Sequence, residues 1–272
     1  MPDLIRFDRA VELRSVSEPF LMRNETKHNL LLGLLSTLEA DPNFYGESAY
    51  FGAVIENGEI VAVAIMTPPH NLVVSGCEDG EALTMIASDV LAFRRDTPGI
   101  NAPVPTSLAF AEAWHRITGD RYEGATRQAL RIYELGQLKP PAHVRGRARL
   151  ADEADVVLLT GWYHAFAAEA VPSEAESMEE TEKGVRRRLA MPSSERAVLI
   201  WEDGGPVSMA GYGNHTPHSL RIGPVYTPPE FRRRGYGSAV TAAACRHILD
   251  SASIAPSSPT SPTRLPTIST RS

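Results

Sequence analysis

One short pattern occurs twice in the 272-residue chain and limits what the chain can fold into. Val54-Ile55-Glu56-Asn57-Gly58 and Ile200-Trp201-Glu202-Asp203-Gly204 share a β-type run, an acid and a turn at one constant offset. Each opens a β-hairpin, because further β-type runs follow at 60–65 and 206–212, and Asn-Gly is a strong hairpin signal. We therefore predict a tandem duplication, the alternative being a chance match between two unrelated hairpins.

The length suits two domains, and a pair of prolines marks the boundary between them. Pro140 and Pro141, followed by basic and polar residues at 143–149, suit neither a helix nor a central strand. We expect a first domain at 1–140 and a second at 147–253. The predicted fold class is α/β (α+β), and each domain is a mixed, mostly antiparallel sheet flanked by helices.

Apolar residues at three- and four-residue spacing predict most of the helices. The expected helices are 20–39, 81–94, 106–118, 126–135, 154–170 and 239–249, and a short strand is expected at 148–150. A further helix carries acids at 174–182 and bases at Arg186, Arg187 and Arg188, an order that suits the helix dipole. These arginines fit a solvated helix face, and a ligand site is the alternative.

Composition and charge exclude several classes of protein. The net charge of -6 gives no general attraction to nucleic acid or anionic lipid, and no apolar run approaches the roughly 20 residues that span a bilayer. The N-terminus lacks the pattern of a secretory signal. Cys77 and Cys245 lie far apart, without the spacing of a zinc site. We expect a cytoplasmic protein with two buried, reduced thiols and no metal, nucleic-acid partner or membrane partner.

The stretch 220–238 has the pattern of a strand, a loop and the start of a helix. Gly223-Pro224 interrupts the strand and favours a bulge, and Pro228-Pro229 ends it. Gly235 and Gly237 allow backbone amides to surround a bound group where the helix begins. Unpaired amides at a helix N-terminus, with arginines beside them, predict an anion-binding site.

The spacing Arg232-x-x-Gly235-x-Gly237 resembles the R/Q-x-x-G-x-G/A signature of the GNAT superfamily of acyl-CoA N-acyltransferases. The resemblance spans residues 147–250 and makes the N-terminal half a diverged copy without the loop. It implies that the loop wraps the coenzyme pyrophosphate and that the preceding strand contacts the pantetheine arm. The implied coenzyme-binding residues are Val225, Tyr226, Thr227, Arg232, Arg233, Arg234, Gly235, Tyr236, Gly237 and Ser238. An arginine-rich surface turn is the alternative, whereas the missing GK[ST] and GxGxxG elements exclude Walker and dinucleotide-binding loops.

The resemblance implies an N-acetyltransferase that passes an acyl group, usually acetyl, directly from acetyl-CoA to a primary amine. The acceptor is a small molecule or a peptide, and no metal is required. Weak candidates for the base are His215 and His218 on a loop, and Glu169 and Glu174 on a helix. Each also fits an ordinary surface position. A non-catalytic acyl-CoA-binding or sensory protein is the main alternative function, and a structural or interaction protein is the third.

The sequence changes character near its end, where residues 254–272 are rich in Ser, Thr and Pro. We expect a disordered tail, although the family pattern requires a strand splayed from the Val225 strand and then a helix. Permitted codons for Thr260 to Arg271, read one nucleotide earlier, encode DLANPTSNNIYQ, which resembles the missing segment. We therefore predict a frameshift or sequencing error. If the tail is native, the Val225 strand should become an unpaired edge with weak coenzyme binding.

Overall fold

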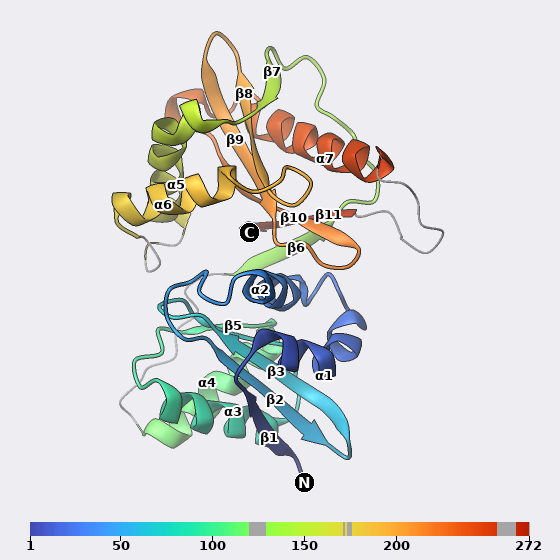
Figure 1. Cartoon of the computed structure of the whole chain (residues 1–272), viewed down its shortest axis with the longest axis vertical. Helices are drawn as coiled ribbons and strands as arrows, with labels where there is room; N and C mark the ends of the chain where they lie inside the picture. The colour runs from blue at the N-terminus through green and yellow to red at the C-terminus, as the bar shows by residue number, and fades with distance from the viewer. Residues whose placement is uncertain (120–128, 171, 173–175, 255–264, 272) are drawn as a thin grey trace. The chain divides into compact units, whose positions relative to one another are not determined.

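The computed structural model describes residues 1–119, 129–170, 172, 176–254 and 265–271. The chain forms two compact units, unit 1 at Met1–Ala129 and unit 2 at Leu130–Ser272. Each unit is built on one sheet that carries helices (Figure 1). Antiparallel pairs dominate both sheets, and each sheet contains one parallel pair. The predicted fold class is confirmed.

The sheet of unit 1 has the strand order β1-β2-β3-β4-β5, in which only β4 and β5 pair in parallel. Its strands are β1 (Asp3–Phe7), β2 (Tyr50–Glu56), β3 (Glu59–Met66), β4 (Leu72–Val74) and β5 (Ile100–Asn101). Its helices are α1 (Ala10–Met22), α2 (Asn29–Ala40), α3 (Gly80–Phe93) and α4 (Val104–Thr118). The β2–β3 turn passes through Asn57 and Gly58 with φ of 51° and 80°, as the Asn-Gly pair predicts.

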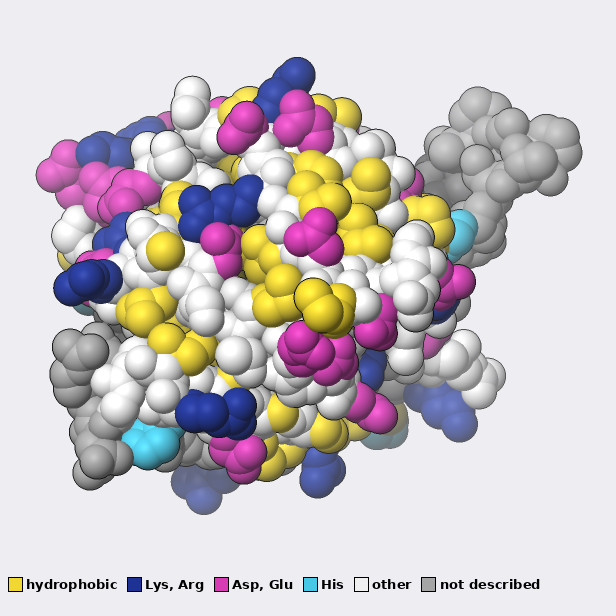
Figure 2. Space-filling view, turned by 90° about the horizontal axis from the view of Figure 1, so that it is seen from below, with side chains coloured by type: hydrophobic (Ala, Val, Ile, Leu, Met, Phe, Trp, Pro, Cys, Tyr) yellow, Lys and Arg dark blue, Asp and Glu magenta, His cyan; other side chains and the backbone are white. Residues whose placement is uncertain are grey.

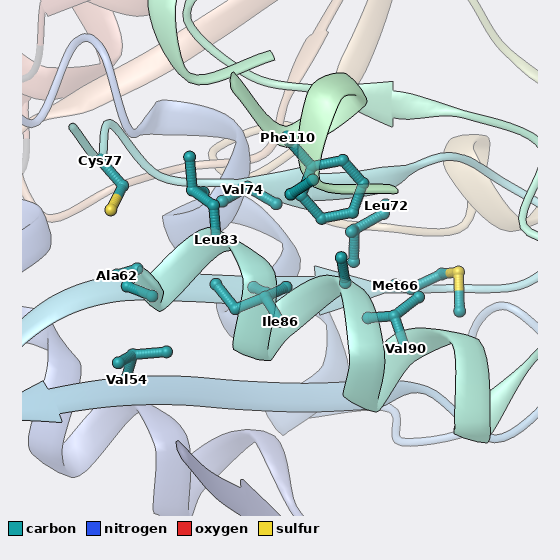
Figure 3. Close-up of a cluster of buried hydrophobic side chains, with 14 of the residues drawn as sticks. Val54, Ala62, Met66, Leu72, Val74, Cys77, Leu83, Ile86, Val90 and Phe110 are labelled. Atoms are coloured by element: carbon teal, nitrogen blue, oxygen red, sulfur yellow. The ribbon is translucent and has the colours of Figure 1, made fainter. Parts of the chain in front are cut away.

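Two apolar clusters hold unit 1 together, one on each face of its sheet. On one face Leu83, Ile86 and Phe110 of α3 and α4 pack with Val54 and Met66 of the hairpin (Figure 3). On the other face, buried leucines of α1 and α2 pack against the same two strands. Because side chains alternate between the two faces along β2 and β3, these strands contribute residues to both clusters.

The sheet of unit 2 has the strand order β6-β11-β10-β9-β8-β7. Its strands are β6 (Leu130–Glu134), β7 (Arg147–Leu150), β8 (Ala197–Glu202), β9 (Pro206–Gly213), β10 (Ser219–Tyr226) and β11 (Leu265–Arg271). Its helices are the short turn η1 (Glu153–Asp155), α5 (Val156–Ala170), α6 (Met178–Leu189), the short turn η3 (Pro229–Phe231) and α7 (Tyr236–Ile254). The apolar clusters place α7 on one face of this sheet and α5 with α6 on the other.

The two units repeat one order of elements. In unit 1, α1 and α2 separate the first two strands, and α3 separates the fourth and fifth strands, which pair in parallel. In unit 2, α5 and α6 lie between β7 and β8, and α7 lies between β10 and its parallel partner β11. This shared order supports the duplication inferred from the two hairpins.

Two predicted helices are wrong in detail. The single helix expected at 20–39 is two helices, α1 and α2, because the buried His28 donates from Nδ1 to the Leu21 carbonyl, at 2.9 Å, and fixes a turn. The helix expected at 126–135 is replaced by β6 at Leu130–Glu134, while 126–128 lie outside the described residues. β6 is a strand because β11 pairs with it, a contact that local periodicity does not reveal.

The chain end also differs from the expectation of a tail without regular structure. The backbone of β11 pairs in parallel with β10 from Ser219↔Leu265 to Ile222↔Ile268. Its other edge pairs antiparallel with β6. Two paired edges supply the backbone hydrogen bonds that a Ser/Thr/Pro-rich composition does not predict. β10 is therefore not an unpaired edge over this stretch, contrary to expectation, and residues 255–264 lie outside the described part of the chain.

An ion-pair network joins β7 to the start of α5. Arg149 donates through both Nη atoms to Asp155, at 2.6 and 2.7 Å, and through Nε to Glu202, at 2.7 Å. The Asp155 side chain is only 8% exposed. The hydrogen bonds from Arg149 lower the pKa of Asp155 below its ordinary value.

The Asp155→Asn variant tests this network through pH. Because the pKa of Asp155 is lowered in the folded state, its stabilisation is present above the unfolded pKa, about 3.9. The stabilisation is lost as pH falls through the lower folded pKa. We expect the variant to reduce the free energy of unfolding by about 1–3 kcal/mol at neutral pH, and the difference to shrink below pH ~4. Urea unfolding across pH measures it, and a difference independent of pH would contradict the assignment.

Charged side chains of both signs are interspersed with hydrophobic ones on the face drawn in Figure 2.

Cys77 and Cys245 are both buried and free of disulfides, as predicted. In the described part of the chain, no helix has the length and apolar character needed to cross a bilayer. Across the same residues, no cluster of His, Cys, Asp and Glu has the arrangement of a metal site.

Candidate functional site

The predicted anion site is the loop between β10 and α7. α7 begins at Tyr236, and the Gly235 carbonyl accepts from the Ala239 amide at 2.9 Å, which makes Gly235 the residue that caps the helix. Gly235 has φ of 83°, a conformation that favours glycine. By helix geometry, the amides of Tyr236, Gly237 and Ser238 have no acceptor within the helix. The helix therefore begins beside Gly235 and Gly237, as the sequence predicts.

The start of α7 packs closely on the end of β10. Ser208, fully buried on β9, donates from Oγ to the Tyr226 carbonyl at 3.0 Å and lies 2.8 Å from Thr227 Oγ1. A Cβ added to Gly237 would lie 3.3 Å from the same Thr227 oxygen, a tight contact. The structure therefore brings the predicted pantetheine-contacting strand and the predicted pyrophosphate loop together.

Arg232 links this loop to α5. Its Nε donates to the Thr227 carbonyl at 2.8 Å, and its Nη2 lies 2.9 and 2.7 Å from the two Glu169 carboxylate oxygens. Its guanidinium carbon lies 5.7 Å from the Tyr226 ring centroid, and the Tyr226 hydroxyl donates to Glu169 at 3.3 Å. The hydrogen bond to Glu169 raises the pKa of Arg232. Both charged side chains are nearly half exposed, so the pair contributes at most about 1 kcal/mol.

The remaining loop residues lie around this junction. Arg233, with φ of 63°, and Arg234 are exposed. The buried Tyr236 donates from its hydroxyl to Asp203 at 2.6 Å, and this hydrogen bond raises its pKa. A Cβ added to Gly235 would lie 3.0 Å from Val144 Cγ2, so the segment before β7 packs against the loop. The arginines therefore stand at the surface beside a helix start whose conformation is fixed by packing.

β10 is interrupted by the predicted bulge. Ile222 pairs with Tyr212 and Val225 with Ala210, so Gly223 and Pro224 together face the single residue Gly211 on β9. The pairing of β10 with β11 ends at Ile222, and beyond that register β11 continues along β6. The two parallel strands thus diverge at the bulge, as the resemblance implies for the strand that admits the pantetheine arm.

The three described candidates for the base lie away from the bulge. His215 and His218 lie in the connection before β10, and His218 is five residues from Gly223, about 16 Å along a strand. Glu169 accepts from Arg232 at the other end of the strand. Glu174 lies outside the described residues. The assignment of a base stays a prediction.

Sequence reasoning missed one residue beside the bulge. The hydroxyl of Tyr163, on α5, would lie 2.9 Å from a Cβ added to Gly211. An isolated glycine inside a strand indicates a bulge or a close approach of another group. Gly211 and Gly213 in the β9 sequence carried that signal, and the partner of the close approach could not be read from it.

The equivalent junction in unit 1 is built differently. α3 begins at Gly80 after the capping residue Asp79, whose carboxylate accepts from the Glu81 amide at 2.8 Å. Glu81 adds a second acid to the first turn. Two carboxylates at a helix start satisfy its amides and repel an anion. The geometry agrees with a diverged copy that lacks the loop.

These features define an α/β protein whose second unit presents an arginine- and glycine-rich helix start at the end of a bulged strand. Residues 159–254 match the family model described as the Acetyltransferase (GNAT) family. The matched segment lies within unit 2, which is therefore similar to the GNAT family. No curated protein sequence matches the chain.

Solved structures resemble the chain across both units. A GCN5-related N-acetyltransferase from Kribbella flavida matches at a TM-score of 0.50 and 16% identity, covering 77% of this chain and 77% of its own. A GNAT-family acetyltransferase from Colwellia psychrerythraea matches at 0.50 and 12%, covering 99% and 90%. A predicted acetyltransferase from Clostridium acetobutylicum, solved with acetyl-CoA, matches at 0.32 and 18%, covering 38% and 73%. At these identities the first two matches show a common fold.

Proposed function

We propose that unit 2 binds acetyl-CoA and transfers its acetyl group directly to a primary amine. The observation that carries the proposal is the start of α7, where amides without an acceptor in the helix lie beside Arg232 and two further exposed arginines. At the equivalent position in unit 1, the start of α3 carries two acidic residues, which would repel an anion. The family match supports acyl transfer from CoA in general.

The residues at this junction fit a diphosphate. The amides of Gly237 and Ser238 point out of the helix start, and the missing Cβ of Gly237 keeps the contact with Thr227 from closing the loop. Arg233 and Arg234 supply fork-shaped donors that suit phosphate oxygens. Held there, the coenzyme would place its pantetheine arm along Val225, where β10 and β11 diverge.

Direct transfer requires positioning more than covalent catalysis. Acetyl-CoA supplies the activated acetyl group, and the neutral amine nitrogen forms the new C–N bond as the C–S bond breaks. The proton that this nitrogen then loses balances the proton that the departing thiolate takes up. The chain would bind the diphosphate at α7, align the arm along the end of β10 beyond the last residue paired with β11, and hold the thioester at the bulge. Alignment of the reacting atoms at about 3–3.5 Å is the main contribution expected of such a site.

A thermal-shift titration tests the binding step. Acetyl-CoA at 100 times its Kd is expected to stabilise the folded protein by about 2.7 kcal/mol. S-acetylpantetheine is the matched control ligand, because it carries the same thioester and arm but no diphosphate. It should produce little shift at the same concentration, and added salt should weaken the acetyl-CoA effect. Equal shifts from the two ligands, or none from acetyl-CoA, would contradict the proposal.

A non-catalytic acyl-CoA-binding or sensory function is the second candidate. It is favoured by the position of the candidate bases, since Glu169 accepts from Arg232 and both histidines lie at the far end of β10. Thiol release in the presence of a panel of amines separates the two functions. A sensor would give the thermal shift without turnover, and an interaction protein would give neither.

A further inference from the structure

The hydroxyl of Tyr163 is a buried polar group whose position no interaction within the described part of the fold explains. Tyr163 lies on α5, whose apolar residues pack on the sheet of unit 2. Its hydroxyl oxygen is buried and has no hydrogen-bond partner among the described residues. Buried hydroxyls are almost always paired, so an unpaired one requires an explanation. A ligand atom is one such explanation.

The position of this hydroxyl points to the bulge of β10. A Cβ added to Gly211 would lie 2.9 Å from the Tyr163 hydroxyl and 3.1 Å from the Gly223 carbonyl oxygen. Any larger residue at 211 would therefore displace the tyrosine or the bulge. Gly211 pairs with the bulge itself, since Gly223 and Pro224 are the two residues opposite it. The Tyr163 hydroxyl therefore lies beside the bulge.

Under the proposed function, on which this inference rests, the bulge is the reacting end of the coenzyme. The diphosphate lies at the start of α7, and the arm runs from Thr227 past Val225, away from the loop. The next residues of β10 in that direction are Pro224 and Gly223. The thioester would therefore lie at the bulge, beside the Tyr163 hydroxyl.

The charges around the hydroxyl favour negative charge on a bound atom. The Arg188 guanidinium lies over the Tyr163 ring at 5.3 Å from its centroid. The buried Arg196 fills the space above Gly213, two residues along β9, with Nε 3.0 Å from an added Cβ. Burial raises the pKa of Tyr163 and outweighs the opposite effect of the two arginines. The hydroxyl therefore keeps its proton at neutral pH and acts as a donor, not as a base.

We propose that Tyr163 is a catalytic residue of the acyl transfer, donating a hydrogen bond to the thioester carbonyl oxygen as negative charge develops on it. No proton is transferred to or from the tyrosine. A donor fixed in a site closed to water stabilises the transition state more than the ground state. The contact should therefore act on kcat and leave the affinity for acetyl-CoA unchanged.

The Tyr163→Phe variant tests this assignment through three measurements. Removing one donor of this kind is expected to lower kcat by about 100-fold, while the acetyl-CoA Kd from calorimetry stays unchanged. Because the lost hydroxyl has no partner among the described residues, the Tm should stay unchanged or rise. The assay follows thiol release from acetyl-CoA with spermidine, kanamycin, tyramine and an alanine-initiated peptide.

Tyr212→Phe is the matched control. Tyr212 is buried on the face that carries α7, and its hydroxyl donates to the Ser193 carbonyl. This variant should lower the Tm and leave kcat unchanged. A Tyr163→Phe enzyme with wild-type kcat, or with a lowered Tm and no selective loss of kcat, overturns the inference and leaves the proposed function standing. A wild-type protein without turnover on any of these amines overturns both.

Discussion

Replacing Gly235 with valine is expected to lower the affinity for acetyl-CoA by more than about 100-fold, because two charge-assisted hydrogen bonds of about 1.5–3 kcal/mol each are lost. Gly235 has φ of 83°, and an added Cβ would lie 3.0 Å from Val144 Cγ2. A β-branched residue is strained in this conformation. Relief of the strain would shift the start of α7 and turn its first amides away from the diphosphate. Isothermal titration with acetyl-CoA measures the effect.

Gly46→Val is the matched control for the backbone strain. Gly46 has φ of 84° in unit 1, and nothing lies within 4 Å of an added Cβ. Its replacement should lower the free energy of unfolding by about 1–3 kcal/mol and leave acetyl-CoA affinity at the wild-type value. Equal losses of affinity in the two variants would indicate general destabilisation. Wild-type affinity in Gly235→Val would show that the diphosphate does not bind at the start of α7.

The sequence predicted features whose cause is local. Asn57 and Gly58 specify their turn by the φ values that they tolerate, and Gly235 marks the helix start for the same reason. The bulge at Gly223-Pro224 follows from a missing side chain and a missing amide. These signals involve residues adjacent in the chain, so one sequence was enough to place both hairpins and the candidate coenzyme loop.

Features that depend on distant partners could not be predicted in this way. β6 and β11 pair with each other, and β11 also pairs with β10, so these strands depend on distant partners more than on their own residues. The separation of α1 from α2 depends on a buried hydrogen bond between His28 and Leu21. In the sequence, Tyr163 cannot be distinguished from the apolar positions of its helix. Its proposed role follows only from its close approach to Gly211 on β9.

Shortening Leu83 to alanine is expected to lower the free energy of unfolding of unit 1 by about 2–5 kcal/mol, through lost burial and the cavity left behind. Leu83 is fully buried on α3 and lies in the cluster with Ile86 and Phe110 (Figure 3). The proposed coenzyme site lies in unit 2, so acetyl-CoA affinity should be retained while unit 1 remains folded. Denaturant unfolding, hydrogen exchange of α3 amides and calorimetric titration together measure the outcome.

Leu108→Ala makes the same chemical change at an exposed position of α4, where the leucine is 53% exposed. That variant should change stability by no more than about 0.5 kcal/mol. Equal effects of the two substitutions would show that the Leu83 cluster is not the core of unit 1. A loss of acetyl-CoA affinity in Leu83→Ala, at a temperature where α3 and α7 both keep their exchange protection, would show that the binding site is not confined to unit 2. Retained affinity together with selectively weakened protection of α3 would support a division of roles between the two units. In that division, unit 2 binds the anion at its helix start, and unit 1 carries carboxylates at the equivalent position.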